Sequence, residues 1–263
     1  MPVVQRDDAE IWWDERGEGD PVLLIQGLGY PSDMWYRLEP ALAERYRVIR
    51  FDNRGVGRTG VPAGPYTIET MAGDAAAVLD AAGVGAAHVV GASMGGVIAQ
   101  ELVLTRPERV ASLVLGCTTP GGAEAAPLSP EAMEMVMARA TMSADEAAEV
   151  AVPFVYAAGT PRSRIDEDVA VRLANPTSPE GYSNQVAGVV QHAGTFSRLG
   201  TIAVPTLVVH GLEDRLVDPA NAKILADAIP GARLELLPDA SHVFFTDQPE
   251  TTLRVLLDFL DQV

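Results

Sequence analysis

Cysteine is nearly absent from this chain of 263 residues, which contains one, Cys117. A single cysteine cannot form a disulfide within the chain, and a chain of this length can bury a sufficient core without a cross-link. Cys117 follows an apolar run and has no basic neighbour, so we expect a buried, unreactive thiol. The cysteine count therefore fits a reducing compartment best.

Basic residues are also scarce, since 19 Lys and Arg stand against 36 Asp and Glu, a net charge of −17. Nucleic acids and anionic membrane surfaces require clustered positive charge, so neither is an expected partner. No run approaches the roughly 18 apolar residues of a membrane span, and residues 1–8 lack the apolar segment of a signal peptide. We expect a soluble, cytoplasmic monomer or homodimer that acts on a small molecule.

Short β-branched runs alternate with helical patterns, which is typical of an α/β fold with a mostly parallel sheet flanked by helices. The expected strands are residues 11–13, 22–25, 47–51, 87–90, 111–115, 204–209 and 233–236. The expected helices are residues 32–45, 67–82, 93–105, 220–228 and 250–261. The glycine-rich turn at 17–20 predicts a tight hairpin between the first two strands.

This alternation stops between Pro120 and Leu199, where the sequence is helical and broken by glycine and proline. About eighty residues are too many for a crossover connection and too structured for a loop. We therefore predict a core domain of residues 1–120 and 198–263. Residues 121–197 are expected to form a helical cap over the carboxyl edge of the sheet, inserted before the last two strands.

The most informative motif is Gly91-Ala-Ser-Met-Gly95, which lies between an apolar run and a helical pattern. A G-x-S-x-G pentapeptide in this setting is typical of a nucleophile elbow. We expect strained, positive-φ angles at Ser93, and glycines at 91 and 95 because side chains there would collide with the flanking strand and helix. The motif predicts that Ser93 is a catalytic nucleophile; the alternative is a turn kept for packing.

A serine nucleophile needs a base to take its proton, and the chain has four histidines. His88 lies in the strand before Ser93 and His210 ends another strand, so both are expected to be structural. His192 falls in the cap, where it can contact substrate or lie on the surface. His242 follows the last strand, at the edge where active sites of open α/β sheets gather. We predict that His242 is the base.

The base in turn needs a carboxylate that fixes its tautomer and stabilises the imidazolium. Residues 211–217 follow the strand that ends at His210 and reach the same edge of the sheet. Asp214 is our prediction for this role. Glu213 and Asp218 are the alternatives, although Asp218 stands before a proline and fits a helix cap better.

An oxyanion that develops during acyl transfer needs preorganised donors. We expect one from the backbone N–H of Met94, at the start of the helix after Ser93. The other is expected from the backbone of Leu28, in the glycine-containing loop that begins at Gln26. A plain glycine turn is the alternative reading of this loop.

The predicted cap is rich in methionine, and this composition indicates an apolar, adaptable wall around the substrate. Methionines at helical spacing are also common in ordinary cores, and nothing in the sequence shows that Arg162, Arg164 or Arg172 faces inward. An uncharged or weakly charged ester or lactone fits this composition best. Expected substrate contacts are Gln26, Met137, Phe154, Tyr156, His192 and Val243, with Met133, Met135 and Met142 as further candidates.

Together these motifs resemble the α/β-hydrolase fold superfamily, in the order Ser93, Asp214, His242 that the family uses. The segment Asp52-Asn-Arg-Gly-Val-Gly-Arg-Thr59 is similar to a family loop with a structural role at the pocket rim. The subgroup that the chain resembles is that of capped bacterial esterases and lactonases, including 3-oxoadipate enol-lactonase, aclacinomycin methylesterase and cofactor-free haloperoxidase types. One departure is Gln26-Gly27, where much of the family has His-Gly.

The resemblance implies a serine hydrolase that cleaves a carboxylic ester or lactone through an acyl-enzyme. A cofactor-free perhydrolase or a carbon–carbon bond hydrolase on the same triad, and a non-catalytic ligand receptor, are the alternatives. No cofactor is implied, and no metal site is expected because the sequence has no His/Cys cluster with ligand spacing.

Overall fold

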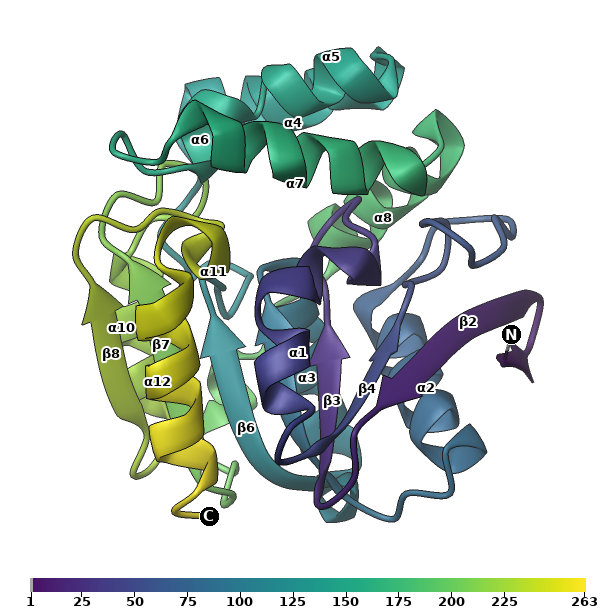
Figure 1. Cartoon of the computed structure of the whole chain (residues 1–263), viewed down its shortest axis with the longest axis vertical. Coiled ribbons are helices and arrows are strands. Elements are labelled where there is room, and N and C mark those ends of the chain that lie inside the picture. The colour runs from purple at the N-terminus through teal and green to yellow at the C-terminus, as the bar shows by residue number, and fades with distance from the viewer. Residues whose placement is uncertain (1) are drawn as a thin grey trace.

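An eight-stranded sheet forms the centre of the protein, seen in a computed structural model that describes residues 2–263 (Figure 1). The strand order is β1-β2-β4-β3-β5-β6-β7-β8, with β1 and β2 antiparallel to their neighbours and the rest parallel. The strands are β1 (Val3–Arg6), β2 (Ala9–Arg16), β3 (Pro21–Ile25), β4 (Arg47–Phe51), β5 (Ala87–Ala92), β6 (Val110–Gly116), β7 (Thr206–Gly211) and β8 (Arg233–Leu237). This arrangement confirms the predicted fold class.

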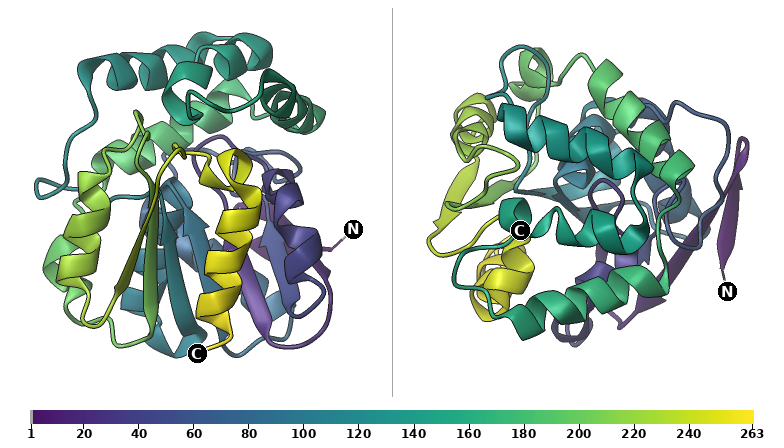
Figure 2. Two further views of the ribbon diagram at one scale, coloured as in Figure 1. Left: turned by 60° about the vertical axis from the view of Figure 1, so that its left-hand side comes forward. Right: turned by 90° about the horizontal axis from the view of Figure 1, so that it is seen from above.

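Helices cover both faces of the sheet (Figures 1 and 2). One face is covered by α2 (Ile68–Ala81), α3 (Met94–Thr105) and α10 (Ala220–Ala228), and the other by α1 (Glu39–Leu42) and α12 (Pro249–Leu260). Among residues 2–263, none of the helices has the length and apolar character needed to cross a bilayer.

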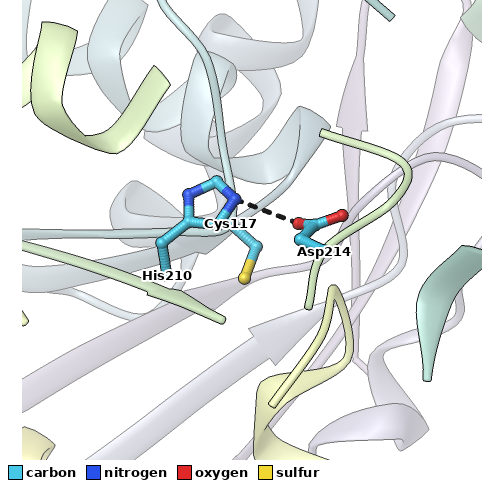
Figure 3. Close-up of side chains that lie close together, drawn as sticks. All are labelled: Cys117, His210 and Asp214. Carbon is cyan, nitrogen blue, oxygen red and sulfur yellow. Dashed lines mark hydrogen bonds and ion pairs between the residues drawn. The ribbon is translucent and has the colours of Figure 1, made fainter. Parts of the chain in front are cut away.

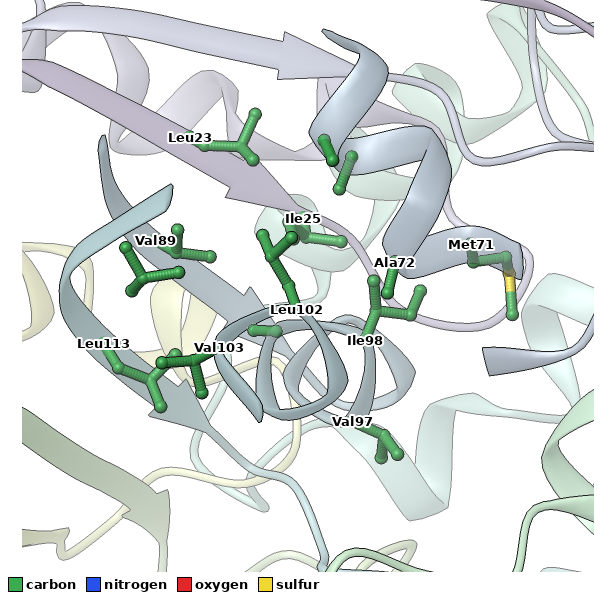
Figure 4. Close-up of a cluster of buried hydrophobic side chains, with 14 of the residues drawn as sticks. Leu23, Ile25, Met71, Ala72, Val89, Val97, Ile98, Leu102, Val103 and Leu113 are labelled. Atoms are coloured by element: carbon green, nitrogen blue, oxygen red, sulfur yellow. The ribbon is translucent and has the colours of Figure 1, made fainter. Parts of the chain in front are cut away.

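The core between the sheet and α2 and α3 consists mostly of aliphatic side chains (Figure 4). Leu102 of α3 is fully buried there, together with Leu23 of β3 and Leu113 of β6. Parallel strands covered on both faces are apolar along their whole length, which explains why β5 is buried at every position. This packing fixes the position of α3, and therefore of the turn that leads into it.

Between β6 and β7 the chain forms a series of helices that lies across the carboxyl ends of the strands (Figures 1 and 2). We call these the cap helices. They are α4 (Pro130–Ala138), α5 (Ala144–Glu149), α6 (Val152–Val155), α7 (Arg162–Ala174), α8 (Pro179–Gln191) and α9 (Phe196–Leu199), with a 3₁₀ turn η3 (Arg139–Thr141) after α4.

Three local predictions were wrong or incomplete. The expected helix 32–45 is a 3₁₀ helix η1 (Ser32–Arg37) followed by the short α1, because Pro40 has no N–H to continue the helical bonds. The turn at 17–20 does not join a hairpin, since β4 lies between β2 and β3. Strand β1 was missed altogether, and it forms the hairpin with β2.

Candidate active site

Ser93 occupies the sharp turn between β5 and α3 with φ 56° and ψ −124°. A β-carbon at Gly91 would overlap the carbonyl of Gly95, and one at Gly95 would overlap the carbonyl of Ile25. Both glycines are therefore required by close backbone approach, and the left-handed φ at Ser93 costs about 1–3 kcal/mol that the surrounding packing must offset.

Backbone hydrogen bonds hold this strained turn on both sides. The N–H of Ser93 donates to the carbonyl of Gly116 at 2.8 Å, and its own carbonyl accepts from the Thr118 hydroxyl at 2.6 Å and from the N–H of Gly96 at 2.8 Å. The side chain takes no part in these bonds. The hydroxyl of Ser93 is thus placed by the main chain and is available for chemistry.

Asp214 and His242 lie next to each other at the same edge of the sheet, on the loops after β7 and β8. Asp214 Oδ2 is 2.8 Å from His242 Nδ1 and 3.0 Å from His210 Nε2. Asp214 Oδ1 accepts from the N–H groups of Leu216 and Val217 at 2.9 and 2.8 Å. The carboxylate therefore accepts four hydrogen bonds, and the proton of His242 lies on Nδ1, which leaves its Nε2 as an acceptor.

The charge on Asp214 is favoured although the side chain is buried. Burial acts against the charged form, but the attraction of His242 and the hydrogen bonds from His210 and His242 outweigh it and lower the pKa of Asp214 to about 2. Asp214 is consequently a carboxylate throughout the neutral range and can stabilise a protonated His242.

His210 is a second hydrogen-bonded neighbour of Asp214, and the sequence did not reveal this contact. Its Nε2 contacts two acceptors, Asp214 Oδ2 and, at 3.0 Å, the carbonyl of Val217. A carbonyl oxygen only accepts, so Nε2 carries the proton and His210 donates to Asp214. The expectation of a buried, hydrogen-bonded histidine at the end of a strand is confirmed, with the added detail that its partner is Asp214.

Cys117, His210 and Asp214 present their ligand-type atoms within 4.8 Å of one another (Figure 3). Burial raises the pKa of the Cys117 thiol well above its usual range, so it remains a neutral thiol. A neutral thiol is a poor metal ligand, and the Nε2 of His210 carries a proton that it donates to Asp214, so we interpret the cluster as packing behind Asp214.

The two alternative acids and the remaining histidines lie elsewhere. Glu213 accepts from the N–H of Ala158, and Asp218 accepts from that of Ala220 at a helix start. His88 pairs with Ser112 within the sheet, as expected of a structural residue. His192 lies 3.3 Å from Glu69 and does not line the cavity described next.

A cavity of about 130 Å³ is lined by Ser93, His242 and the loop that begins at Gln26. Among residues 2–263 no hydrogen bond joins the side chains of Ser93 and His242, and such bonds are often long before a substrate binds. The remaining lining is mostly apolar: Leu28, Ala92, Met94, Val97, Leu128, Val136, Val155, Val189, Leu216, Val217, Val243 and Phe245.

Leu28 and Met94, the two predicted oxyanion donors, both line this cavity. Neither donates to an acceptor within residues 2–263, whereas Gly29 donates to Gln185 at 2.9 Å. A β-carbon at Gly27 would lie 2.9 Å from the β-carbon of Ser93, so only glycine allows the loop to approach the serine this closely. Both N–H groups are therefore without a partner among residues 2–263, and their role as oxyanion donors stays a prediction.

Of the predicted substrate contacts, Gln26 and Val243 line the cavity and four others do not. Met137 is exposed to solvent, and the Tyr156 hydroxyl donates to Asp168 at 3.1 Å. His192 and Phe154 also lie outside the lining. The cavity lining gives these four residues no support, and as substrate contacts they stay predictions.

Further methionines proposed for the wall, Met133, Met135 and Met142, are likewise absent from the cavity lining. Its cap side is formed instead by smaller branched residues and by Arg139, which the sequence gave no reason to single out. The Asp52 loop is structural, as expected: Asp52 accepts from Ser32 and Arg58, and Arg54 pairs with Asp74 at 2.6 Å.

The fold agrees with that of the known proteins to which this sequence is similar. The chain belongs to the α/β hydrolase fold family, whose profile matches residues 20–249. The family match and the relatives named as hydrolases identify the chain as a hydrolase.

The relatives extend over the whole chain. A protein of Azorhizobium caulinodans named "Putative carbamate hydrolase RutD" is 34% identical over 270 residues, covering 100% of this chain and 99% of that protein. The enol-lactonase of Burkholderia xenovorans LB400 superposes with a TM-score of 0.87 at 28% identity, covering 99% and 100% of the two chains. A thermophilic esterase of Thermogutta terrifontis gives 0.86 at 28% identity, covering 97% and 94%.

Proposed function

We propose that this protein is a serine hydrolase that cleaves a carboxylic ester or lactone through an acyl-enzyme intermediate. The single observation that supports this most is the hydrogen bond of 2.8 Å from His242 Nδ1 to Asp214. It leaves the Nε2 of His242 as a base at a cavity that Ser93 also lines. The relatives named as an esterase and an enol-lactonase support the same reaction class.

In the proposed reaction, Ser93 Oγ attacks the carbonyl carbon while His242 Nε2 takes the hydroxyl proton. The carbonyl π electrons move onto oxygen, and the N–H groups of Leu28 and Met94 bind the resulting oxyanion, each worth about 3–4 kcal/mol by analogy with measured cases. The tetrahedral intermediate collapses, the C–O bond to the alcohol breaks, and His242 gives its proton to the leaving alkoxide.

Water then releases the acyl group by the same chemistry. His242 Nε2 takes a proton from water, the hydroxide oxygen bonds to the acyl carbon, and the second intermediate expels Ser93 Oγ, which recovers the proton from His242. Asp214 keeps its charge in both halves and stabilises the imidazolium, as its lowered pKa of about 2 requires. The released products are an acid and an alcohol, or a hydroxy acid from a lactone.

A fluorophosphonate label followed by peptide mapping tests the nucleophile. We expect one labelled site, at Ser93, and no label in Ser93→Ala. Labelling at another serine, or none in the folded wild-type protein, would refute the assignment. A panel of methyl esters, γ- and δ-lactones, a methyl carbamate and peroxide-dependent bromination then separates ester or lactone cleavage from the reactions named for other relatives.

A further inference from the structure

Four arginine side chains in the described part of the chain are buried, and they fall into two kinds. Arg50 pairs with Asp33 at 2.6 Å, and Arg54 pairs with Asp74 at 2.6 Å. Arg139 and Arg172, only 5% and 7% exposed, have neither an acidic partner nor a hydrogen bond from the guanidinium within residues 2–263. Since a buried charge is costly unless it is paired, the second kind requires an explanation.

Aromatic rings stabilise part of the buried charge of these two arginines, which lack an acidic partner. The guanidinium of Arg139 lies 4.8 Å from the ring centre of Tyr182, and that of Arg172 lies 4.3 Å from Tyr30. A cation over a ring gains about 0.5–2 kcal/mol, less than a buried ion pair supplies. Burial, with the nearby charge of Arg172, lowers the pKa of Arg139, so the two positive charges oppose each other.

Arg139 stands at the boundary between two hollows. It lines the catalytic cavity, and it also lines an adjoining cleft of about 340 Å³ that Arg172 lines as well. A β-carbon at Gly29 would lie 3.7 Å from Arg139 Nη2, which places the guanidinium against the loop that carries the Leu28 N–H. Arg139 therefore borders the same cavity as Ser93, the nucleophile of the proposed reaction.

Neither hollow contains a compensating charge. The chain has 36 Asp and Glu residues and a net charge of −17, yet no acidic side chain lines the catalytic cavity or the adjoining cleft. The charged side chains that line the two hollows, His242 apart, are thus both arginines among residues 2–263, and positive side chains attract anionic ligands.

We propose that Arg139, assisted by Arg172, binds a carboxylate of the substrate, so that the ester or lactone cleaved by this protein is an anion. The planar, forked guanidinium matches a carboxylate with two parallel hydrogen bonds, and the small catalytic cavity suits a short chain between the carboxylate and the reacting carbonyl. This inference rests on the proposed function, and it replaces the expectation of an uncharged or weakly charged substrate drawn from the cap composition.

Paired substrates that differ only in charge test the proposal. Monomethyl succinate, glutarate and adipate carry a carboxylate, and the corresponding methyl ester amides are uncharged and of equal size. We expect kcat/KM by pH-stat to be about 10- to 100-fold higher for the acid than for the amide at the best chain length, the range of one charge-assisted hydrogen-bond pair. A ratio near one in the wild-type enzyme overturns the proposal.

Variants at position 139 locate the effect. Arg139→Met is expected to bring the acid-to-amide ratio close to one, and Arg139→Lys to retain part of it; Arg172→Met should reduce it less. Arg162→Met is the matched control, since Arg162 is exposed and paired with Glu149, and its ratio should equal that of the wild type. Each ratio is measured within one preparation, so partial misfolding of a variant cancels.

Binding without turnover separates the two proposals. In Ser93→Ala, glutarate should raise the melting temperature while glutaramide does not, and adding Arg139→Met should remove the effect. If no ester is cleaved but glutarate still binds at Arg139, the proposed function fails and the anion site stands. If esters are cleaved with no preference for the acids, the function stands and the anion site fails.

Discussion

Replacing Asp214 by asparagine is the most informative perturbation of this site, because every group around the carboxylate is a donor. Oδ2 faces His242 Nδ1 and His210 Nε2, and Oδ1 faces the N–H groups of Leu216 and Val217. The NH₂ of an asparagine must point at one of these pairs in either orientation. It stays satisfied next to His242 only if Nδ1 gives up its proton, which moves to Nε2 and removes the base.

We expect Asp214→Asn to lower kcat for p-nitrophenyl butyrate by about 10⁴-fold, the loss seen elsewhere when this tautomer is inverted. Stability should also fall by about 2–4 kcal/mol, since a buried network loses its charge. Stopped assays with active-site titration give kcat, and thermal unfolding gives stability. Asp218→Asn is the control, because Asp218 only begins a helix. A folded Asp214→Asn enzyme that retains a tenth of the wild-type kcat would refute the reasoning.

Three further results are expected. Ser93→Ala should lose all measurable esterase activity at an unchanged melting temperature, and retention of more than a few per cent contradicts the nucleophile assignment. Gly27→Ala places a β-carbon 2.9 Å from that of Ser93 and should reduce kcat by about 10²-fold by displacing an oxyanion donor, with unaltered kcat as the contrary result. The pKa of Asp214 is lowered from 3.8 to about 2, so its charge contributes about 2 kcal/mol to the free energy of unfolding above pH 5. This contribution is lost as the pH falls through 2. Acid unfolding that is equally steep in Asp214→Asn would argue against this.

Strands and buried helices were predictable because their signals are local. The run at 47–51 matches β4, and the pattern at 220–228 matches α10, since apolar periodicity decides such elements. Which strands pair with each other was harder to predict from the sequence. The glycines at 17–20 looked like a hairpin turn, although Gly17 is packed closely against the carbonyls of Ala43 and Tyr46. A turn sequence specifies a bend and not which strand lies beside the next.

The residues of the candidate site also divide into those that the sequence predicts and those that it does not. Ser93 follows from a pentapeptide, and His242 and Asp214 follow from the ends of strands, where parallel topology brings distant loops together. The second histidine on Asp214 and the cap wall do not follow, because they depend on which side of an element faces the sheet. Arg139 in particular lies in a run of ordinary helical sequence, and only its burial without an acid distinguishes it.

The main-chain bonds at Ser93 have a consequence for protein engineering. Since the Gly116 carbonyl, the Thr118 hydroxyl and the Gly96 N–H fix the backbone at this position and the Ser93 hydroxyl does not, the side chain can be exchanged without moving the backbone. A cysteine there would present sulfur at the same point, and a glycine would relax the unfavourable dihedral angles. A substitution at position 93 can therefore raise thermal stability while it removes the nucleophile. Variant libraries screened for heat resistance alone should accordingly be enriched in inactive proteins.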